Sequence, residues 1–232
     1  MEIKDLNKDY RYERKFRVPY HMRHIIPSIM ESLFFDFWEI YEERRVNSIY
    51  FDTARYDFAL HHVNGYKERK KIRIRYYGNF EKAKNPFLEY KIKNGLLGYK
   101  RKFKLKNFDS SFSSKSILDL LINNDLGGKL YNDLVNLSPS VFVTYIRSYY
   151  LSLCGNFRIT FDKDIAYYSL LGSKLLMPDS QTYIEDKYCL LELKYGSDND
   201  GIASEIANRF NFRITNNSKY INALLSHGII CN

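Results

Sequence analysis

Charged and apolar residues alternate along several short segments of the chain. Between Lys71 and Gly78, Arg73 and Arg75 alternate with Ile72 and Ile74. Successive side chains of a β-strand point to opposite faces, so this pattern predicts a strand with one charged and one apolar face. The same alternation surrounds four other charged pairs: Glu13 and Lys15, Glu89 and Lys91, Arg158 and Asp162, and Glu192 and Lys194. We therefore expect a sheet whose inner wall is lined by charge, like a polar tunnel.

The periodicity and the turn residues between segments also predict the order of the elements. Strands are expected at residues 10–19, 46–53, 66–77, 87–93, 98–105, 141–153, 156–163 and 182–195. Helical spacing predicts helices at 20–36, near 117–137 and in a pair within 201–227, with a short helix or turn at 55–62. About eight strands at hairpin-like spacing predict an α+β fold, an eight-stranded antiparallel β-barrel with flanking helices. No domain boundary is evident, so we expect one domain over residues 1–232.

Composition narrows the range of partners. The 232 residues are 45% hydrophobic and 27% charged, which is typical of a globular protein and not of a disordered one. The net charge of +9 favours an acidic partner, such as a phosphate compound, nucleic acid or an anionic membrane. Three widely spaced cysteines, without a C-x-x-C pair, indicate reduced thiols and a cytoplasmic protein. No secretion signal or membrane-spanning run is present, so we expect no membrane span.

The charged strand faces suggest phosphate chemistry if they line one cavity. The basic residues at these positions are Lys15, Arg73, Arg75, Lys91, Arg147, Arg158, Lys194 and Lys219, and the carboxylates are Glu13, Glu89 and Glu192. Like charges ~6 Å apart repel by about 3 kcal/mol at an effective dielectric of ~20, and a polyanion would relieve that repulsion. Carboxylates beside phosphate suit a bridging Mg²⁺ or Mn²⁺. Taken singly, each pair is at least as well explained as a cross-strand ion pair that contributes little stability.

Taken in order, the motifs resemble the catalytic domain of the VTC (vacuolar transporter chaperone) family, which belongs to the triphosphate tunnel metalloenzymes. The resemblance covers roughly residues 10–225. It rests on Glu13-Arg14-Lys15, Val46–Thr53, Arg73–Gly78, Glu89-Tyr90-Lys91, Tyr145-Ile146-Arg147, Arg158–Asp162 and Leu191–Lys194. It implies an eight-stranded antiparallel tunnel that binds triphosphate or polyphosphate with a divalent metal, Mn²⁺ or Mg²⁺.

The resemblance also implies roles for individual residues. The implied catalytic residues are Arg73, Arg75, Lys91, Arg147, Arg158 and Glu192. The implied phosphate ligands are Lys15, Arg73, Arg75, Lys91, Arg147, Arg158, Lys194 and Lys219, the last of these in a Ser218-Lys219 pair on the C-terminal helix. Glu192 is the expected metal ligand, with Glu13 or Glu89 as a second one.

Some positions depart from the pattern or leave it open. Cyclases and thiamine triphosphatases of the superfamily carry Glu-x-Glu-x-Lys on the first strand, but Arg11 replaces the first glutamate here. This favours the VTC branch and puts a second metal ion in question. Lys100 and Lys102 share a strand face, with a solvated face as the default interpretation. Asp52 is expected to have a structural role in a turn, and Trp38 is expected to lie in the core.

Together with the charged strand faces, the resemblance implies a metal-dependent polyphosphate polymerase that transfers the γ-phosphoryl group of a nucleoside triphosphate to a polyphosphate chain. A triphosphatase would use the same tunnel with water as the acceptor. A non-catalytic polyphosphate-binding module would bind the same ligands without turnover. A nucleic-acid binder is a weaker alternative, because it would require basic and aromatic residues on an open outer surface rather than inside a closed barrel, and no nucleic-acid partner is expected. Eukaryotic VTC proteins work in a membrane complex, which leaves a membrane-bound partner open.

Overall fold

The computed structural model describes residues 11–33, 36–79, 83–94, 97–106, 108, 120, 134–173 and 183–231. Most of the helical segment predicted near 117–137 lies outside these residues. Within the described part of the chain, no helix is both long and apolar enough to cross a membrane.

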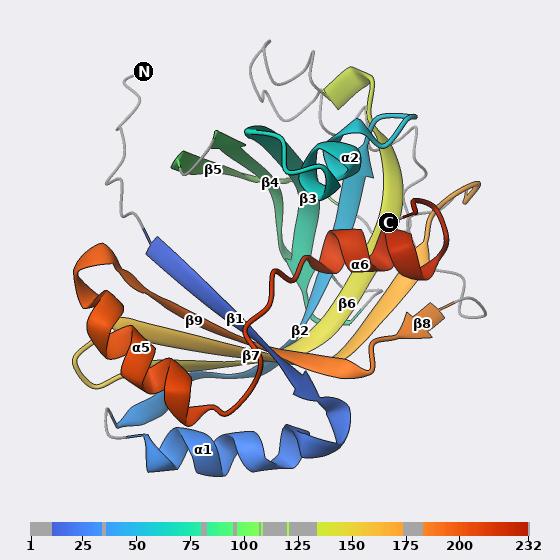
Figure 1. Ribbon diagram of the computed structural model, residues 1–232. Coiled ribbons are helices and arrows are strands. Elements are labelled where there is room, and N and C mark those ends of the chain that lie inside the picture. Colours follow the sequence, from blue (N-terminus) through green and yellow to red (C-terminus); the bar gives the residue numbers. More distant parts are fainter. Residues whose placement is uncertain are drawn as a thin grey trace. The chain divides into compact units, whose positions relative to one another are not determined.

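The described strands form one sheet of nine strands, which differ in length (Figure 1). They are β1 (Arg11–Pro19), β2 (Phe37–Asp52), β3 (Glu68–Tyr77), β4 (Lys84–Asn94), β5 (Leu97–Lys104), β6 (Ser138–Ser152), β7 (Phe157–Ser169), β8 (Tyr183–Glu185) and β9 (Tyr188–Gly196). Their order is β1-β9-β7-β6-β2-β3-β4-β5, with β8 paired to β7. The β1–β9, β7–β9, β7–β8, β2–β3, β3–β4 and β4–β5 pairs are antiparallel.

The predicted fold class, an antiparallel sheet with flanking helices, is confirmed, but the sheet is open. In the part of the chain that the structure describes, β1 and β5 are edge strands, so the expected closure into an eight-stranded barrel is corrected. Alternation along a strand predicts which side chains share a face. It carries no information on whether the first and last strands meet, because closure depends on stagger and tilt across the whole sheet.

Every strand predicted from alternation is present, with differences at the ends. β2 begins at Phe37, well before residue 46, and Trp38 on this extension is 52% exposed rather than in the core. The strand expected at 182–195 is divided into β8 and β9. β7 continues to Ser169 through Asp164, which has a φ of 50° between the part paired with β9 and the part paired with β8.

Side chains that accept hydrogen bonds from backbone N–H groups mark the start of two of the helices. They are η1 (Tyr20–Ile25), α1 (Ile26–Ser32), α2 (Asp57–Val63), η2 (Ser197–Asn199), α5 (Asp200–Arg209) and α6 (Lys219–Ser226). The Asp52 carboxylate accepts hydrogen bonds from the N–H groups of Phe58 and Ala59, each at 3.0 Å, at the start of α2. Its predicted turn role is therefore confirmed. Ser218 caps α6 by accepting from the Ile221 N–H at 3.4 Å.

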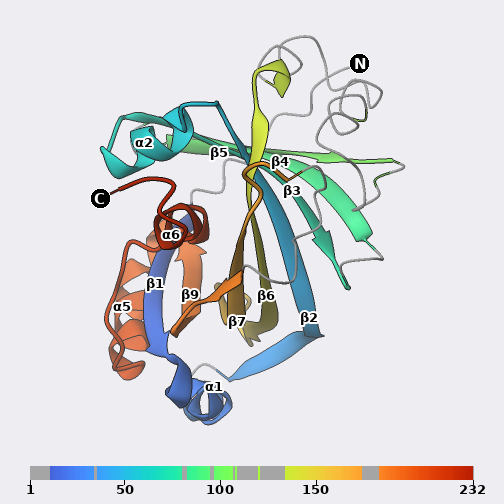
Figure 2. The same cartoon turned by 90° about the vertical axis from the view of Figure 1, so that its right-hand side faces the viewer.

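The chain divides into two compact units, and β2, β6 and β7 contribute residues to both. Unit 1 comprises Met1–Glu43, Arg147–Lys163 and Lys187–Asn217, and unit 2 comprises Arg44–Ile146, Asp164–Asp186 and Ser218–Asn232. Each has its own apolar cluster, around Phe16, Ile159 and Leu193 in unit 1 and around Ile72, Ile74 and Leu88 in unit 2. Within unit 1, α5 lies along β1 and β9 (Figures 1 and 2).

Candidate phosphate and metal site

Strand alternation places charged side chains on the face opposite each apolar cluster, and they form one group in each unit. We call the group in unit 2, made of Arg73, Arg75, Glu89, Lys100 and Lys102, the arginine cluster. The group in unit 1, made of Glu13, Lys15, Arg147, Asp162, Glu192 and Lys194, is the carboxylate cluster. Each is described by itself.

Glu89 is the centre of the arginine cluster. Its Oε2 lies 2.7 Å from Arg73 Nε and 2.6 Å from Arg73 Nη2, and its Oε1 lies 2.6 Å from Lys100 Nζ. Arg75 and Lys102 approach it to 3.8 Å. Burial acts to raise the pKa of Glu89, but the neighbouring cations outweigh it and hold the pKa far below the usual range. Glu89 is thus an ionised counter-ion shared by several cations.

Tyrosines on two other strands, Tyr50 on β2 and Tyr145 on β6, hold the two arginines of the cluster. Arg73 Nη1 donates to the Tyr50 hydroxyl at 2.8 Å, and Arg75 Nη2 donates to the Tyr145 hydroxyl at 3.0 Å. The Lys219 ammonium lies 4.6 Å from the centroid of the Tyr145 ring. The Arg75 Nε–H is buried and has no acceptor among the described residues. A buried, unpaired donor of this kind is a place where a ligand oxygen is expected.

The register of β3, β4 and β5 extends the basic surface. Three rows of directly opposed residues cross these strands: Lys71, Lys91 and Lys100; Arg73, Glu89 and Lys102; and Arg75, Phe87 and Lys104. Lys91 is exposed. In the strand register Lys100 and Lys102 share the face of Arg73, and both side chains are exposed, as expected for a solvated basic strand. Cations therefore far outnumber carboxylates on this face.

The positive charge of this face perturbs Lys100. Burial lowers its pKa most, repulsion by Arg73 lowers it further, and Glu89 acts in the opposite direction. The net result lowers the pKa of Lys100 to about 7. An added anion would favour the protonated form, so the cluster is electrostatically suited to a negatively charged ligand.

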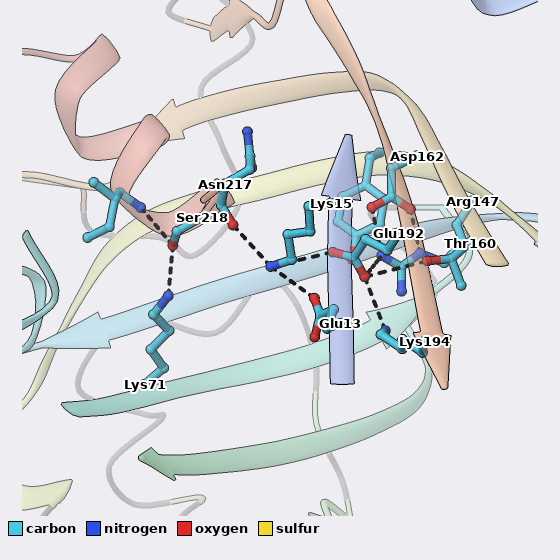
Figure 3. Close-up of polar contacts among 12 residues, drawn as sticks. Glu13, Lys15, Lys71, Arg147, Thr160, Asp162, Glu192, Lys194, Asn217 and Ser218 are labelled. Atoms are coloured by element: carbon cyan, nitrogen blue, oxygen red, sulfur yellow. Dashed lines mark hydrogen bonds and ion pairs between the residues drawn. The ribbon is translucent and has the colours of Figure 1, made fainter. Parts of the chain in front are cut away.

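In the carboxylate cluster, β1, β9 and β7 bring acids and bases into opposed rows. Lys15 faces Glu192, which faces Thr160, while Glu13 faces Lys194. The Lys15 ammonium lies 3.0 Å from Glu13 Oε1 and 3.7 Å from Glu192 Oε1, and it donates to the Asn217 carbonyl at 3.0 Å (Figure 3). Lys194 Nζ lies 3.1 Å from Glu192 Oε2. One ammonium group thus bridges two carboxylates.

Arg147 is held in a fixed orientation beside Glu192. Its Nε donates to Asp162 Oδ1 and its Nη2 donates to Asp162 Oδ2 at 2.6 Å, in a two-point contact. Its Nη2 also lies 3.9 Å from Glu192 Oε2. Asp162 is fully buried, so it orients Arg147 rather than meeting a ligand itself.

The donor set of the carboxylate cluster fits a hard divalent cation. Glu13 and Glu192 supply oxygens, and a cation, Lys15, already lies between them. Burial and Glu192 act to raise the pKa of Glu13, but Lys15 and Lys194 outweigh them and lower it, so the carboxylate is ionised. No group of three or more acidic, histidine or cysteine side chains in the described ranges could hold a metal. Mg²⁺ commonly takes one or two carboxylates and completes its shell with water and substrate phosphates.

The predicted site residues are thus distributed over both clusters. Arg73, Arg75, Glu89, Lys91 and Lys219 lie in unit 2, and Glu13, Lys15, Arg147, Arg158, Glu192 and Lys194 lie in unit 1. Arg158 is exposed and lies opposite Lys194 in the strand register. Side chains outside the predicted set that hold these residues are Tyr50, Lys100, Lys102, Tyr145 and Asp162. Alternation in β5 and β7 marked Lys100, Lys102 and Asp162, but nothing local marked the tyrosines.

Comparison with known proteins gives a family and a fold. The model of the family described as VTC domain matches residues 10–227. No curated protein matches. Similar solved structures include the PH1819 protein from Pyrococcus horikoshii OT3, with a TM-score of 0.52, 14% identity and coverage of 94% of this chain and 98% of that one.

Two further structures are similar to this chain. A putative adenylate cyclase from Vibrio parahaemolyticus has a TM-score of 0.51 and 13% identity, covering 93% of this chain and 97% of its own. The putative adenylyl cyclase HpAC1 from Hippeastrum, described as having a dominant triphosphatase activity, has a TM-score of 0.53 and 13% identity, covering 93% and 95%. At these identities the similarity establishes the fold.

Proposed function

This chain belongs to the VTC domain family, and on that premise we propose that it is a metal-dependent polyphosphate polymerase. Membership confirms the resemblance drawn from the sequence. It also makes the chain an enzyme of the triphosphate tunnel type, a phosphotransferase or triphosphatase that depends on a divalent metal. The proposal goes further in naming the acceptor: the end of a polyphosphate chain rather than water.

The observation that carries the proposal is the unbalanced charge of the arginine cluster. Several cations surround one buried carboxylate, and the buried Arg75 Nε–H lacks an acceptor among the described residues. Guanidinium groups match phosphate oxygens in two-point geometry. A triphosphate or a longer phosphate chain would supply both the missing acceptors and the missing negative charge.

The proposed reaction needs no nucleophilic side chain. A terminal oxygen of the acceptor chain attacks the γ-phosphorus of a nucleoside triphosphate, a new P–O bond forms, and the bond to the β-phosphate oxygen breaks, which releases a nucleoside diphosphate. The residues assigned to stabilising charge on the transferring group are Arg73, Arg75, Lys91, Arg147 and Arg158. Those assigned to neutralising the phosphate chain are Lys15, Lys194 and Lys219. Catalysis then consists mainly of positioning and electrostatic stabilisation.

Glu192 and Glu13 are assigned to hold Mn²⁺ or Mg²⁺. When bound, this ion would neutralise charge on the phosphate oxygens. Glu89 was predicted as a third candidate for this role. Because Arg73 and Lys100 contact its two oxygens at 2.6 Å, closer than the 3.0 Å and 3.1 Å at which the nearest cations approach Glu13 and Glu192, we assign it instead to positioning Arg73 and Lys100.

A triphosphatase is the second candidate, since the Hippeastrum protein of similar fold is described as a triphosphatase. A non-catalytic binding module is the third. We further propose a cytoplasmic location, because Cys154, Cys189 and Cys231 are free thiols, as expected in a reducing compartment. A membrane-bound partner stays a prediction from the family.

The experiment is to incubate the protein with ATP and Mn²⁺ or Mg²⁺ and separate the products by anion exchange and gel electrophoresis. Long-chain polyphosphate is expected. Orthophosphate alone would show a triphosphatase, and tight binding without turnover would show a binding module. Arg73→Ala and Glu192→Ala should abolish product. Glu205→Gln, on an exposed face of α5, is the matched control and should not change it.

A further inference from the structure

We propose that Tyr50, Tyr220 and Asp52 are positioning residues that hold Arg73 for phosphate binding and make helix α6 part of that arrangement. This inference rests on the proposed function of Arg73. All four residues belong to unit 2, and three of them, on β2 and α6, lie outside the predicted site. Their contacts form a continuous chain from the arginine to the start of α2.

The first link is between Arg73 and Tyr50. On one side, Arg73 Nε and Nη2 both engage Glu89 Oε2. On the other side, Nη1 donates to the Tyr50 hydroxyl at 2.8 Å. With acceptors on two sides, the plane of the guanidinium group is defined, and N–H donors beyond these contacts are left for a ligand. Without Tyr50, the contact at Glu89 would be the only side-chain acceptor holding Arg73 among the described residues.

The second link is between the rings of Tyr50 and Tyr220. They are stacked, with centroids 4.9 Å apart and an interplanar angle of 18°. Tyr50 is 5% exposed and Tyr220 is 2% exposed. Because Tyr220 comes from α6, the orientation of the Tyr50 phenol depends on a helix more than a hundred residues away in the sequence. Stacking and burial leave the Tyr50 ring little freedom.

The third link fixes Tyr220. Its hydroxyl donates to Asp52 Oδ2. Asp52 also accepts from the N–H groups of Thr53 at 2.7 Å and of Phe58 and Ala59 at 3.0 Å each. Burial raises the pKa of Tyr220, so its hydroxyl keeps its proton and remains a donor. Four donors therefore hold the Asp52 carboxylate, and Asp52 in turn fixes the position of the Tyr220 hydroxyl.

A second contact of α6 reaches the same strand face. Lys71, two residues before Arg73 on β3, donates to the Ser218 hydroxyl at 2.8 Å (Figure 3). Ser218 is also the N-cap of α6. The beginning of α6 is thus attached to the strand that carries Arg73 and stacks on the tyrosine that holds Arg73. Displacing α6 would remove the support of Tyr50 and leave Arg73 held by Glu89.

The test uses the full chain and inorganic tripolyphosphate, with binding measured by titration calorimetry. Tyr50→Phe keeps the stacked ring and removes only the hydroxyl. We expect it to weaken binding about fivefold to tenfold, as for loss of one hydrogen bond that positions a charged group. Tyr220→Phe should weaken binding in the same direction and by less. With ATP and metal, KM should rise more than kcat falls.

A thermodynamic cycle separates positioning from general stability. In an Arg73→Ala background, Tyr50→Phe should have no further effect on tripolyphosphate binding, because the residue acts through Arg73. Tyr195→Phe is the matched control. The Tyr195 hydroxyl also accepts from an arginine, Arg14, at 2.7 Å, and both residues belong to unit 1. Binding should be unchanged in this variant.

The possible failures are distinguishable. If Arg73→Ala binds tripolyphosphate as the wild type does, the proposed function of the arginine cluster is wrong. If Arg73→Ala loses binding while Tyr50→Phe retains it, the positioning role is overturned and the function stands. An equal effect of Tyr50→Phe with and without Arg73 would also overturn the positioning role.

Discussion

The two charged clusters use the same strand alternation and reach different electrostatic balances, with four cations around one carboxylate in the arginine cluster and three cations with three carboxylates in the carboxylate cluster. In the arginine cluster one carboxylate, Glu89, is shared by Arg73, Lys100 and more distant cations. In the carboxylate cluster, Glu13 and Glu192 share one ammonium group, that of Lys15. The first arrangement has an excess of positive charge and suits an anion. The second brings acidic oxygens together and suits a cation. Carboxylates on similar strand faces therefore have different roles, and their neighbours decide which.

The largest expected effect is a loss of stability, caused by a substitution that removes the central carboxylate charge of the arginine cluster. Glu89→Gln removes the counter-charge of Arg73 and Lys100 and should lower the free energy of unfolding by about 3 kcal/mol, because unpaired buried charges are destabilising. Urea unfolding measures this change. Since the pKa of Glu89 is held far below the usual range, the difference from wild type should persist into mildly acid solution. Glu185→Gln, at an exposed position, is the control, and an equal loss there would contradict the prediction.

The next largest effect is a loss of turnover, caused by a substitution that removes one carboxylate charge from the carboxylate cluster. Glu192→Gln keeps the size of the side chain and removes a charged oxygen from the assigned metal ligands. Activity should fall about 100-fold, as for loss of a metal ligand or its supporting contact. The free energy of unfolding should change much less than in Glu89→Gln. Turnover is measured over a range of Mn²⁺ concentrations, with Glu205→Gln in parallel. Full activity in Glu192→Gln would refute the assignment.

A smaller effect, on pH dependence, sharpens the comparison at Lys100. The lowered pKa of about 7 means that Lys100 is cationic below neutral pH and loses its charge as the pH rises. Tripolyphosphate binding should therefore weaken relative to Lys100→Arg, by about threefold between pH ~6 and pH ~8. Comparing the two proteins cancels the ionisation of the ligand itself. A constant ratio of the two dissociation constants would show that Lys100 does not titrate in this range.

The smallest effect is expected at Arg158, which lies opposite Lys194 of the carboxylate cluster in the strand register. Arg158 is exposed, and the solvent screens its charge. Arg158→Ala should weaken tripolyphosphate binding only about twofold to fivefold, the range of an exposed ion pair, and by less at high salt. Titration calorimetry at two salt concentrations measures this. A loss of tenfold or more that is insensitive to salt would mean that Arg158 meets the ligand in a desolvated site.

Much of the fold was predictable from local pattern. Ile72 and Ile74 alternate with Arg73 and Arg75, and the structure buries the first pair and places the second on the charged face. The turn role of Asp52 followed from its place after a strand and is confirmed by its contacts with α2. By contrast, Trp38 was expected in the core and is half-exposed, because bulk and hydrophobicity do not reveal which strand face is covered.

The sequence by itself determined the family, the strands and the face on which each charged residue lies, because these depend on neighbours one or two positions away. Only the tertiary structure decided that Glu89 would collect cations, that Glu13 and Glu192 would share Lys15, and that Tyr220 would stack on Tyr50. Glu13 and Lys15 lie two positions apart on β1, but the contacts of Lys100 with Glu89, of Lys15 with Glu192 and of Tyr220 with Tyr50 each join residues on different elements. Their register and distance are set by the packing of whole strands and helices, which no local pattern records.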